Sequence, residues 1–169
     1  MLKRFSAYIV AGSFAGLLAG CAHAPVSPPP DTAGAVAAIR TLGMHYESSV
    51  QVNAVRDPAV DGFVAAAKSL EDKEQFHDAL AQIDKALVIA PHAPDLLQYA
   101  AELAIETGDW KRAGELARQS YDTGPKIGDL CARNLETLAR ALTVQDDVAG
   151  AAQAREKIEA CRVPPVPRF

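Results

Sequence analysis

The side chains with the most distinctive chemistry in this sequence are its three cysteines, Cys21, Cys131 and Cys161. A thiolate can attack a substrate, bind a metal, form a disulfide or accept a lipid. No Cys-x-x-Cys pair is present, and the four histidines have no metal-ligand spacing such as His-Glu-x-x-His. There is also no glycine-rich phosphate loop and no Gly-x-Ser-x-Gly motif. The sequence therefore predicts no catalytic site, no metal site and no bound cofactor, and it favours a protein that is not an enzyme.

Cys21 follows a segment with the layout of an export signal. Lys3 and Arg4 are its only charges, and the run from Phe5 to Ala19 is uncharged. That run is too short to span a bilayer, which needs about 20 apolar residues. Small residues come directly before the cysteine, as the narrow subsites of a signal peptidase require.

The set Leu18-Ala19-Gly20-Cys21 resembles a bacterial lipobox. The resemblance implies that residues 1–20 are a lipoprotein signal peptide and that Cys21 receives a diacylglyceryl group and then an acyl chain on its freed amine. Two or more chains are what durable anchoring requires, because one chain holds only marginally. The alternative is that Cys21 ends an ordinary signal peptide or an uncleaved anchor helix.

Residues 21–32 are rich in proline and small residues, so they are expected to form an extended tether of about 3.1 Å per residue. Simple terminal disorder makes the same structural prediction. Ala22, rather than aspartate, follows the cysteine, and by resemblance to enterobacterial sorting this favours the outer membrane. The predicted location is the periplasmic face of that membrane.

Charge and composition limit the possible partners. The chain carries a net charge of −4, and removal of Lys3 and Arg4 with the signal takes it to −6. An acidic balance argues against nucleic acid and against a polybasic membrane patch. Alanine is abundant and only 6% of residues are aromatic, which is typical of closely packed helices. No small-molecule substrate is evident.

The central part of the sequence repeats itself. FHDALAQIDKALVIAP begins at Phe76, and WKRAGELARQSYDTGP begins 34 residues later at Trp110. The offset pairs two aromatics, two alanines and two prolines, which are Phe76 with Trp110, Ala79 with Ala113, and Pro91 with Pro125. The stretch GDWKRA, which starts at Gly108, is the most regular part. This period and pattern resemble the tetratricopeptide repeat (TPR), a unit of two antiparallel helices.

Local signals give the expected helix limits. Asp57-Pro58 is an N-cap followed by the first helical residue, and the prolines 91 and 125 end helices. Helices are predicted over 58–72, 75–89, 94–107 and 109–121. A third, degenerate pair follows, with DDVAGAAQA matching GDWKRAGELA at an offset of 38. The fold class is therefore all-α: a short α-solenoid of about three TPR-like pairs in one domain, 57–163.

The flanking segments are less regular. Residues 33–56 include AVAAIRTL, which could form a short helix, and SSVQVNAV, which alternates somewhat like a strand. We expect an irregular segment that packs on the first repeat. Residues 164–169 form a proline-rich tail, for which a loose end is favoured over a docking motif.

Cys131 begins one helix of the third pair and Cys161 ends the next. These ends are neighbours in an antiparallel hairpin, and an exported protein with two remaining cysteines is a candidate for one disulfide. Such a bond closes a loop of about 30 residues, which stabilises a fold by roughly 3–4 kcal/mol. The alternative is two buried free cysteines that act as small hydrophobes.

With no catalytic pattern, what remains is a binding surface. In the TPR family the first helix of each unit lines a concave groove for a peptide or a partner helix. Helical phase predicts the groove residues Asp61, Val64, Lys68, Gln98, Glu102, Glu136 and Arg140. The predicted function is a scaffold or assembly factor that binds another cell-envelope protein. Similar lipoproteins serve secretin or pilus assembly, barrel assembly and peptidoglycan machines. The alternatives are a pilotin-like factor or a small periplasmic enzyme subunit.

Overall fold

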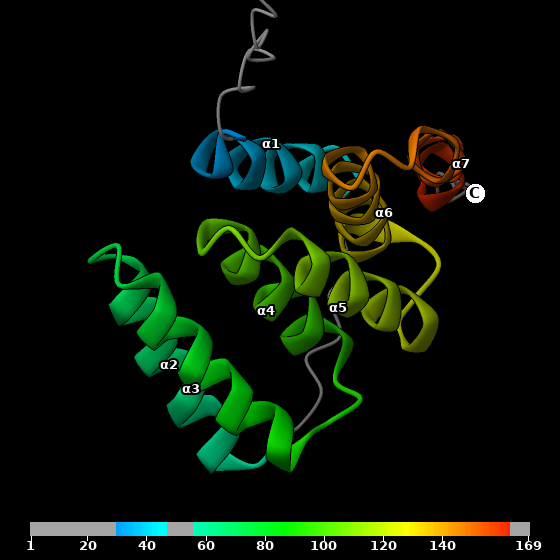
Figure 1. Ribbon diagram of the computed structural model, residues 1–169. Helices are drawn as coiled ribbons and strands as arrows, with labels where there is room; N and C mark the ends of the chain where they lie inside the picture. The colour runs from blue at the N-terminus through cyan, green and yellow to red at the C-terminus, as the bar shows by residue number, and fades with distance from the viewer. Residues whose placement is uncertain (1–29, 47–55, 163–169) are drawn as a thin grey trace, which may run out of the picture.

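The computed structural model describes residues 30–46 and 56–162. Within these ranges the chain is entirely helical, with seven α-helices, one short 3₁₀ helix and no strand (Figure 1). The elements are α1 (Thr32–Met44), α2 (Pro58–Glu71), α3 (Phe76–Ile89), α4 (Pro94–Glu106), α5 (Trp110–Thr123), α6 (Gly128–Val144), α7 (Val148–Glu156) and η1 (Ile158–Cys161).

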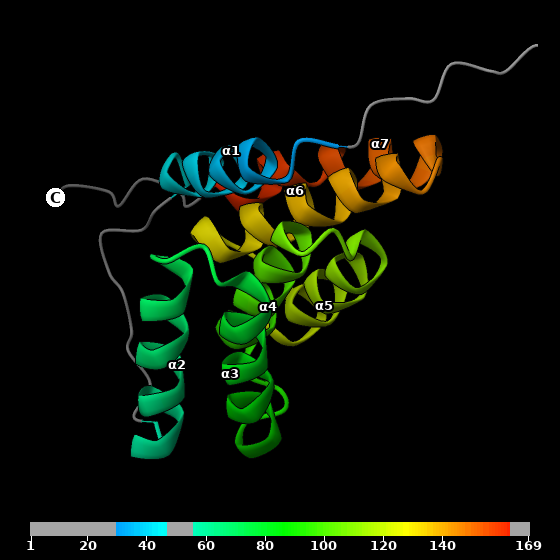
Figure 2. The same cartoon turned by 60° about the vertical axis from the view of Figure 1, so that its left-hand side comes forward.

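Six of these helices form three consecutive antiparallel pairs. Helix α2 packs on α3, α4 on α5, and α6 on α7, and each pair contacts the next through α3 with α4 and α5 with α6 (Figures 1 and 2). The connections within and between pairs are short, which forces neighbouring helices to run in opposite directions. This confirms the predicted all-α fold with three helix pairs. The inner face is defined here as the side formed by the first helix of each pair, α2, α4 and α6.

Aspartate caps fix the start of one helix in each pair. Asp57 accepts a hydrogen bond from the Ala59 amide at 2.8 Å, directly before Pro58. Asp109 caps α5 and Asp147 caps α7 in the same way, with N···O distances of 3.0 and 2.8 Å. Each carboxylate satisfies one of the amides that a helix start leaves without a partner. The predicted helix limits in the first two pairs consequently agree with the observed ones to within two residues.

The turn inside each pair has the same backbone geometry. One residue adopts a left-handed conformation, and these residues are Glu74 (φ 58°), Gly108 (φ 80°) and Asp146 (φ 62°). The next amide then bonds a carbonyl five residues back, which joins Gln75 to Leu70, Asp109 to Ala104 and Asp147 to Leu142 at 2.9, 2.8 and 2.9 Å. This is the Schellman closure of a helix. The spacing of the three residues matches the sequence offsets of 34 and 38.

Replacement of Gly108 by alanine is expected to lower the free energy of unfolding by about 1–2 kcal/mol. A Cβ there meets no neighbour, so the cost comes from the left-handed backbone alone. Gly62 lies inside α2 and also has open space around it. Gly62→Ala is therefore the matched control and should stabilise the protein by about 0.5–1 kcal/mol, because alanine is the better helix former. Urea unfolding followed by circular dichroism measures both; equal effects would contradict this account.

Small residues let the helices approach closely. Ala67, Ala79, Ala100 and Ala113 are fully buried, and Ala79 and Ala113 are the alanines that the 34-residue offset pairs. Trp110 is buried and Phe76 packs half-buried against the same core. Pro91 and Pro125 lie exposed just beyond α3 and α5. The repeat residues thus serve packing and helix termination.

The third pair differs in its second helix. Helix α7 ends at Glu156, and the last turn continues as the 3₁₀ helix η1. The apolar residues Ala151, Ala154 and Ile158 of this region are nevertheless buried. In the structure Cys131 of α6 and Cys161 of η1 are joined by a disulfide, with their Cα atoms 5.6 Å apart.

The expectation for residues 33–56 is wrong in its described part. Thr32–Met44 forms a regular helix, α1, capped by Asp31, whose carboxylate accepts from the Gly34 amide at 2.9 Å. It packs mainly on α6 and α4, in the third and second pairs, and reaches the first repeat through Arg40. The physical reason is that its apolar residues at positions 36 and 39 share one helical face. Several predicted segments lie outside the described residues: the signal peptide with Cys21, residues 47–55 and the tail 164–169.

Candidate interaction surface

Helix α1 lies on the inner face of the solenoid. It packs across α4 and α6 and lies at the top of Figure 1. Val36 and Ile39 are buried in this contact. The chain's own N-terminal helix therefore covers part of the surface that the sequence assigned to a partner.

A buried carboxylate holds α1 against the inner face through hydrogen bonds and ion pairs. Glu102 of α4 is fully buried and accepts hydrogen bonds from Arg40 of α1 at 2.8 Å and from Nε of Arg133 of α6 at 2.9 Å. Gln98, one turn earlier in α4, donates to Glu102 at 2.9 Å and to Thr137 at 2.9 Å. Charged partners are what make a buried carboxylate tolerable. One side chain thus joins three helices.

Arg40 extends this network to the first pair. Its Nη2 lies 2.7 Å from Glu71 Oε1, at the end of α2, and Tyr99 donates to Glu71 Oε2 at 2.6 Å. Burial raises the pKa of Tyr99, and the hydrogen bond to Glu71 raises it further. Burial alone would lower the pKa of Arg40, but Glu102 and Glu71 outweigh it and raise the pKa. Arg40 consequently stays charged in the folded state.

Gly43 explains how closely α1 approaches α6. A Cβ at this position would lie 2.7 Å from the Cγ and Cδ atoms of Arg133. The missing side chain gives the arginine stem room to pass against α1 and reach Glu102. Gly43 does not have a positive φ, so its role is close approach rather than an unusual backbone conformation.

Helix α1 divides the open part of the inner face into two hollows. The first, called here the α2-side hollow, has a volume of about 520 Å³ and includes Val64, Lys68, Arg56 and Asp95 in its lining. Most of its charges are paired: Arg56 with Asp95, and Arg133 with Glu102 and Asp129. Among the described residues, Lys68 has no carboxylate partner, so it is the cation that this hollow offers to a ligand.

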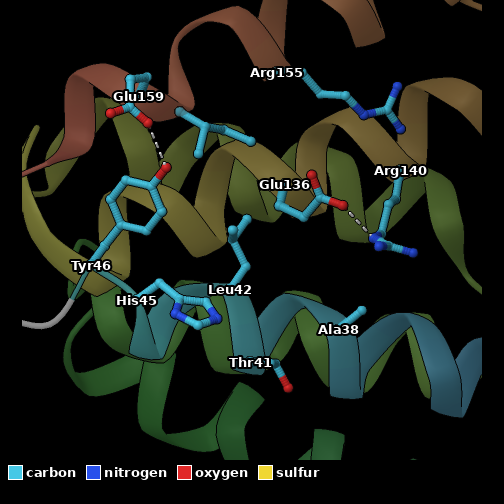
Figure 3. A pocket seen from close by; sticks show the side chains of 10 residues that line it. Ala38, Thr41, Leu42, His45, Tyr46, Glu136, Arg140, Arg155 and Glu159 are labelled. Carbon is cyan, nitrogen blue, oxygen red and sulfur yellow. Dashed lines mark hydrogen bonds and ion pairs between the residues drawn. The ribbon is translucent and has the colours of Figure 1, made fainter.

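The second hollow, called here the α7-side hollow, lies between α1, α6 and the α7–η1 segment (Figure 3). Its volume is about 590 Å³. Glu136 and Arg140 of α6 are joined there by an ion pair at 2.7 Å. At the other end, the Tyr46 hydroxyl donates to Glu159 at 3.1 Å. Hydrogen bonds from Arg162 and Tyr46 lower the pKa of the Glu159 carboxyl.

The predicted groove residues therefore separate into four groups. Val64 and Lys68 line the α2-side hollow, whereas Glu136 and Arg140 line the α7-side hollow. Asp61 is exposed but belongs to neither. Gln98 and Glu102 are buried beneath α1 and tied to neighbouring helices, so neither side chain projects toward a partner, although Glu102 forms part of the wall of the α2-side hollow.

Sequence reasoning missed the residues that complete this surface. These are Arg40 on α1 and Tyr46 just after it, Tyr99 and Arg133 beneath α1, and Arg155 on α7. The available signal was the amphipathic spacing of the α1 segment, with Val36 and Ile39 on one face and Arg40 beside them. A buried acid in the repeats then needs a cation, and Arg40 supplies it.

Two kinds of feature are not found in the described ranges. No helix within 30–46 and 56–162 is both long and apolar enough to cross a bilayer. The same ranges contain no group of three or more histidine, cysteine or acidic side chains placed to hold a metal ion.

The fold and this surface define a short helical-repeat domain whose inner face is partly filled by its own N-terminal helix. No protein-family model matches the chain, and neither does any curated protein. Among solved structures, it is similar to the globular C-terminal domain of P. aeruginosa LpoP, with 30% sequence identity and a TM-score of 0.55. The match covers 62% of this chain and 99% of that one. The chain belongs to the family of this LpoP domain.

Proposed function

We propose that this protein is a lipid-anchored interaction module, which holds or helps assemble another protein of the cell envelope at the periplasmic face of the outer membrane. The observation that carries the proposal is the inner face, where α1 leaves two open hollows lined by polar and charged side chains. The lipobox-like Leu18–Cys21 segment supports the anchoring, and the shared family with LpoP supports the envelope setting.

The 34-residue spacing and the repeated turn geometry support the finer proposal that the helix pairs are TPR units. Repeat solenoids bind partners along an extended inner surface. Three pairs offer a short surface, so a modest interface is expected. Binding is favoured over catalysis because ion pairs line the hollows, and no hydrogen bond among the described residues joins a serine, threonine or cysteine nucleophile to a base there.

Pull-down of the full-length protein from detergent extracts tests the function. We expect one envelope protein to be recovered by the natural chain, and recovery to fall about tenfold when Lys68→Glu or Arg140→Glu reverses a charge in one hollow. A peptidoglycan-synthesising enzyme is the first candidate to test, because this class is among the machines expected from the sequence and the chain shares a family with LpoP.

Lys111→Glu is the matched control, because Lys111 is exposed on α5 and lines neither hollow. It changes the net charge by the same amount and should leave recovery unchanged. Failure of the natural chain to retain any envelope protein would overturn the proposed function. If all three charge reversals lowered recovery equally, the loss would come from the change in net charge and not from either hollow.

Mass spectrometry of the mature protein tests the anchor. We expect an N-terminal Cys21 that carries a diacylglyceryl group and a further acyl chain, because two or more chains give stable membrane attachment. Cys21→Ala should release the protein into the soluble periplasmic fraction or leave it as uncleaved precursor. An unmodified mature chain that starts at another residue would contradict the anchoring.

A further inference from the structure

The α7-side hollow is a preformed site with firm walls. The disulfide between Cys131 and Cys161 fixes η1 against α6, and the hydrogen bond between Tyr46 and Glu159 fixes it against the end of α1. The guanidinium of Arg162 lies 5.1 Å from the centre of the Tyr46 ring. A ligand that enters the hollow therefore does not need to order these elements first, which lowers the cost of binding.

One end of the hollow has an excess of positive charge. Arg140 of α6 and Arg155 of α7 both lie there, with Glu136 as the single carboxylate between them (Figure 3). Nε of Arg140 donates to Glu136 at 2.7 Å, and the two terminal amino groups of Arg140 have no hydrogen-bond partner among the described residues. Arg155 makes only a long contact of 3.4 Å with the Thr143 hydroxyl. This end can accept another carboxylate.

The positive end stands out against the rest of the molecule. The chain has a net charge of −4, so a local excess of arginine is not a general property of its surface. Two guanidinium groups with free N–H donors are the arrangement that best binds a carboxylate, through short, charge-assisted hydrogen bonds.

The middle of the hollow is apolar. Ala38 and Leu42 of α1 line it (Figure 3), and Ile158 of η1 also belongs to the lining. A volume of about 590 Å³ falls within the range that holds a small ligand or a few side chains. The hollow thus combines an anion-binding end with an apolar centre.

We propose that the α7-side hollow binds an extended segment of the partner protein in which an acidic side chain lies close to an aliphatic one. The acidic side chain contacts Arg140 and Arg155, and the aliphatic side chain packs between Leu42 and Ile158. This inference rests on the proposed function and adds the chemistry of the partner's contact segment.

Site-specific photo-crosslinking in cells, with the full-length protein, tests the inference. A photoreactive amino acid replaces Thr41, which is exposed on α1 at the edge of the hollow. A second variant carries it at Val88 of α3, which is 83% exposed and far from the hollow in sequence and fold. We expect position 41, but not position 88, to form crosslinks to one partner segment with an acidic residue within three positions of an aliphatic residue.

Charge reversal then tests the arginines. Arg140→Glu with Arg155→Glu should lower the crosslinking yield at position 41 by about tenfold or more, since two charge-assisted hydrogen bonds are lost. Arg140→Gln with Arg155→Gln should give an intermediate loss and keeps the test valid if the reversed protein folds poorly. Lys111→Glu with Arg118→Glu, two exposed cations of α5, is the matched control and should have no effect. Lysine in place of the partner's acidic residue should restore crosslinking to the reversed protein.

Several results would overturn the inference. One is a crosslinking yield that does not change when the arginines are reversed, and another is a captured segment without an acidic residue. Crosslinks to residues 163–169 or to a second copy of this chain would also overturn it. If the pull-down retains a partner but position 41 captures none of it, this inference fails while the proposed function stands. If the pull-down recovers nothing, the proposed function itself fails.

Discussion

Glu102→Ala is expected to lower the free energy of unfolding by about 3 kcal/mol, one of the two largest effects of a substitution in this protein. Removing one partner of a buried ion pair typically costs about 3–5 kcal/mol, because the remaining charge is left without compensation. The lower end applies because the side chains of Arg40 and Arg133 are 40% and 24% exposed and can turn toward water. Urea unfolding followed by circular dichroism at neutral pH measures the change.

Two variants sharpen this test. Glu102→Gln keeps a hydrogen-bonding group but removes the charge, so it should lose less stability than the alanine variant. Glu136→Ala removes an acid whose ion pair lies within one helix, where such pairs contribute only about 0.3–0.5 kcal/mol. If Glu102→Ala destabilised the protein no more than Glu136→Ala, Glu102 would not be the tie between helices that the structure indicates.

Replacing both Cys131 and Cys161 by alanine is expected to lower the free energy of unfolding by about 3–4 kcal/mol. The bond joins residues separated by 30 positions, and the loss of loop closure in the unfolded chain gives this magnitude. Both side chains are almost fully buried, so truncation adds a packing loss, but it is minor because each alanine lacks only one buried sulfur atom. The same urea series provides the measurement.

Reduction of the natural protein gives an independent comparison. Its stability with reductant should approach that of the double alanine variant, and the variant itself should not respond to reductant. Peptide mapping without reductant should recover Cys131 and Cys161 in one linked fragment. Natural protein in which both thiols react with an alkylating agent before reduction would contradict the bond.

The helix pairs could be predicted from the sequence because local chemistry specifies them. Asp57 with Pro58 sets a helix start, and Gly108 sets a turn, without reference to anything distant in the chain. The alanines of the repeat likewise appear where close packing requires them. These signals act within a few residues, so a single sequence is sufficient to read them.

The inner face could be predicted only in part because helical phase gives the direction of a side chain and not what covers it. Gln98 and Glu102 do lie on the side of α4 that faces inward, but α1 covers them. The contact between Arg40 and Glu102 spans 62 positions, and no local pattern links them. Lys68 and Arg140 line hollows because they lie to either side of α1, and their role toward a partner stays a prediction.

The position of α1 also changes how this solenoid is expected to fold. In an ordinary repeat array each unit contacts only its neighbours, so unfolding can begin at one end and proceed stepwise. Here Tyr46 contacts Glu159 across 113 positions, which ties the start of the domain to its last turn. Helix α1 cannot dock until α6 and η1 are present, so a chain that emerges N-terminus first completes its fold late. The long-range closure turns a linear stack into a single cooperative unit.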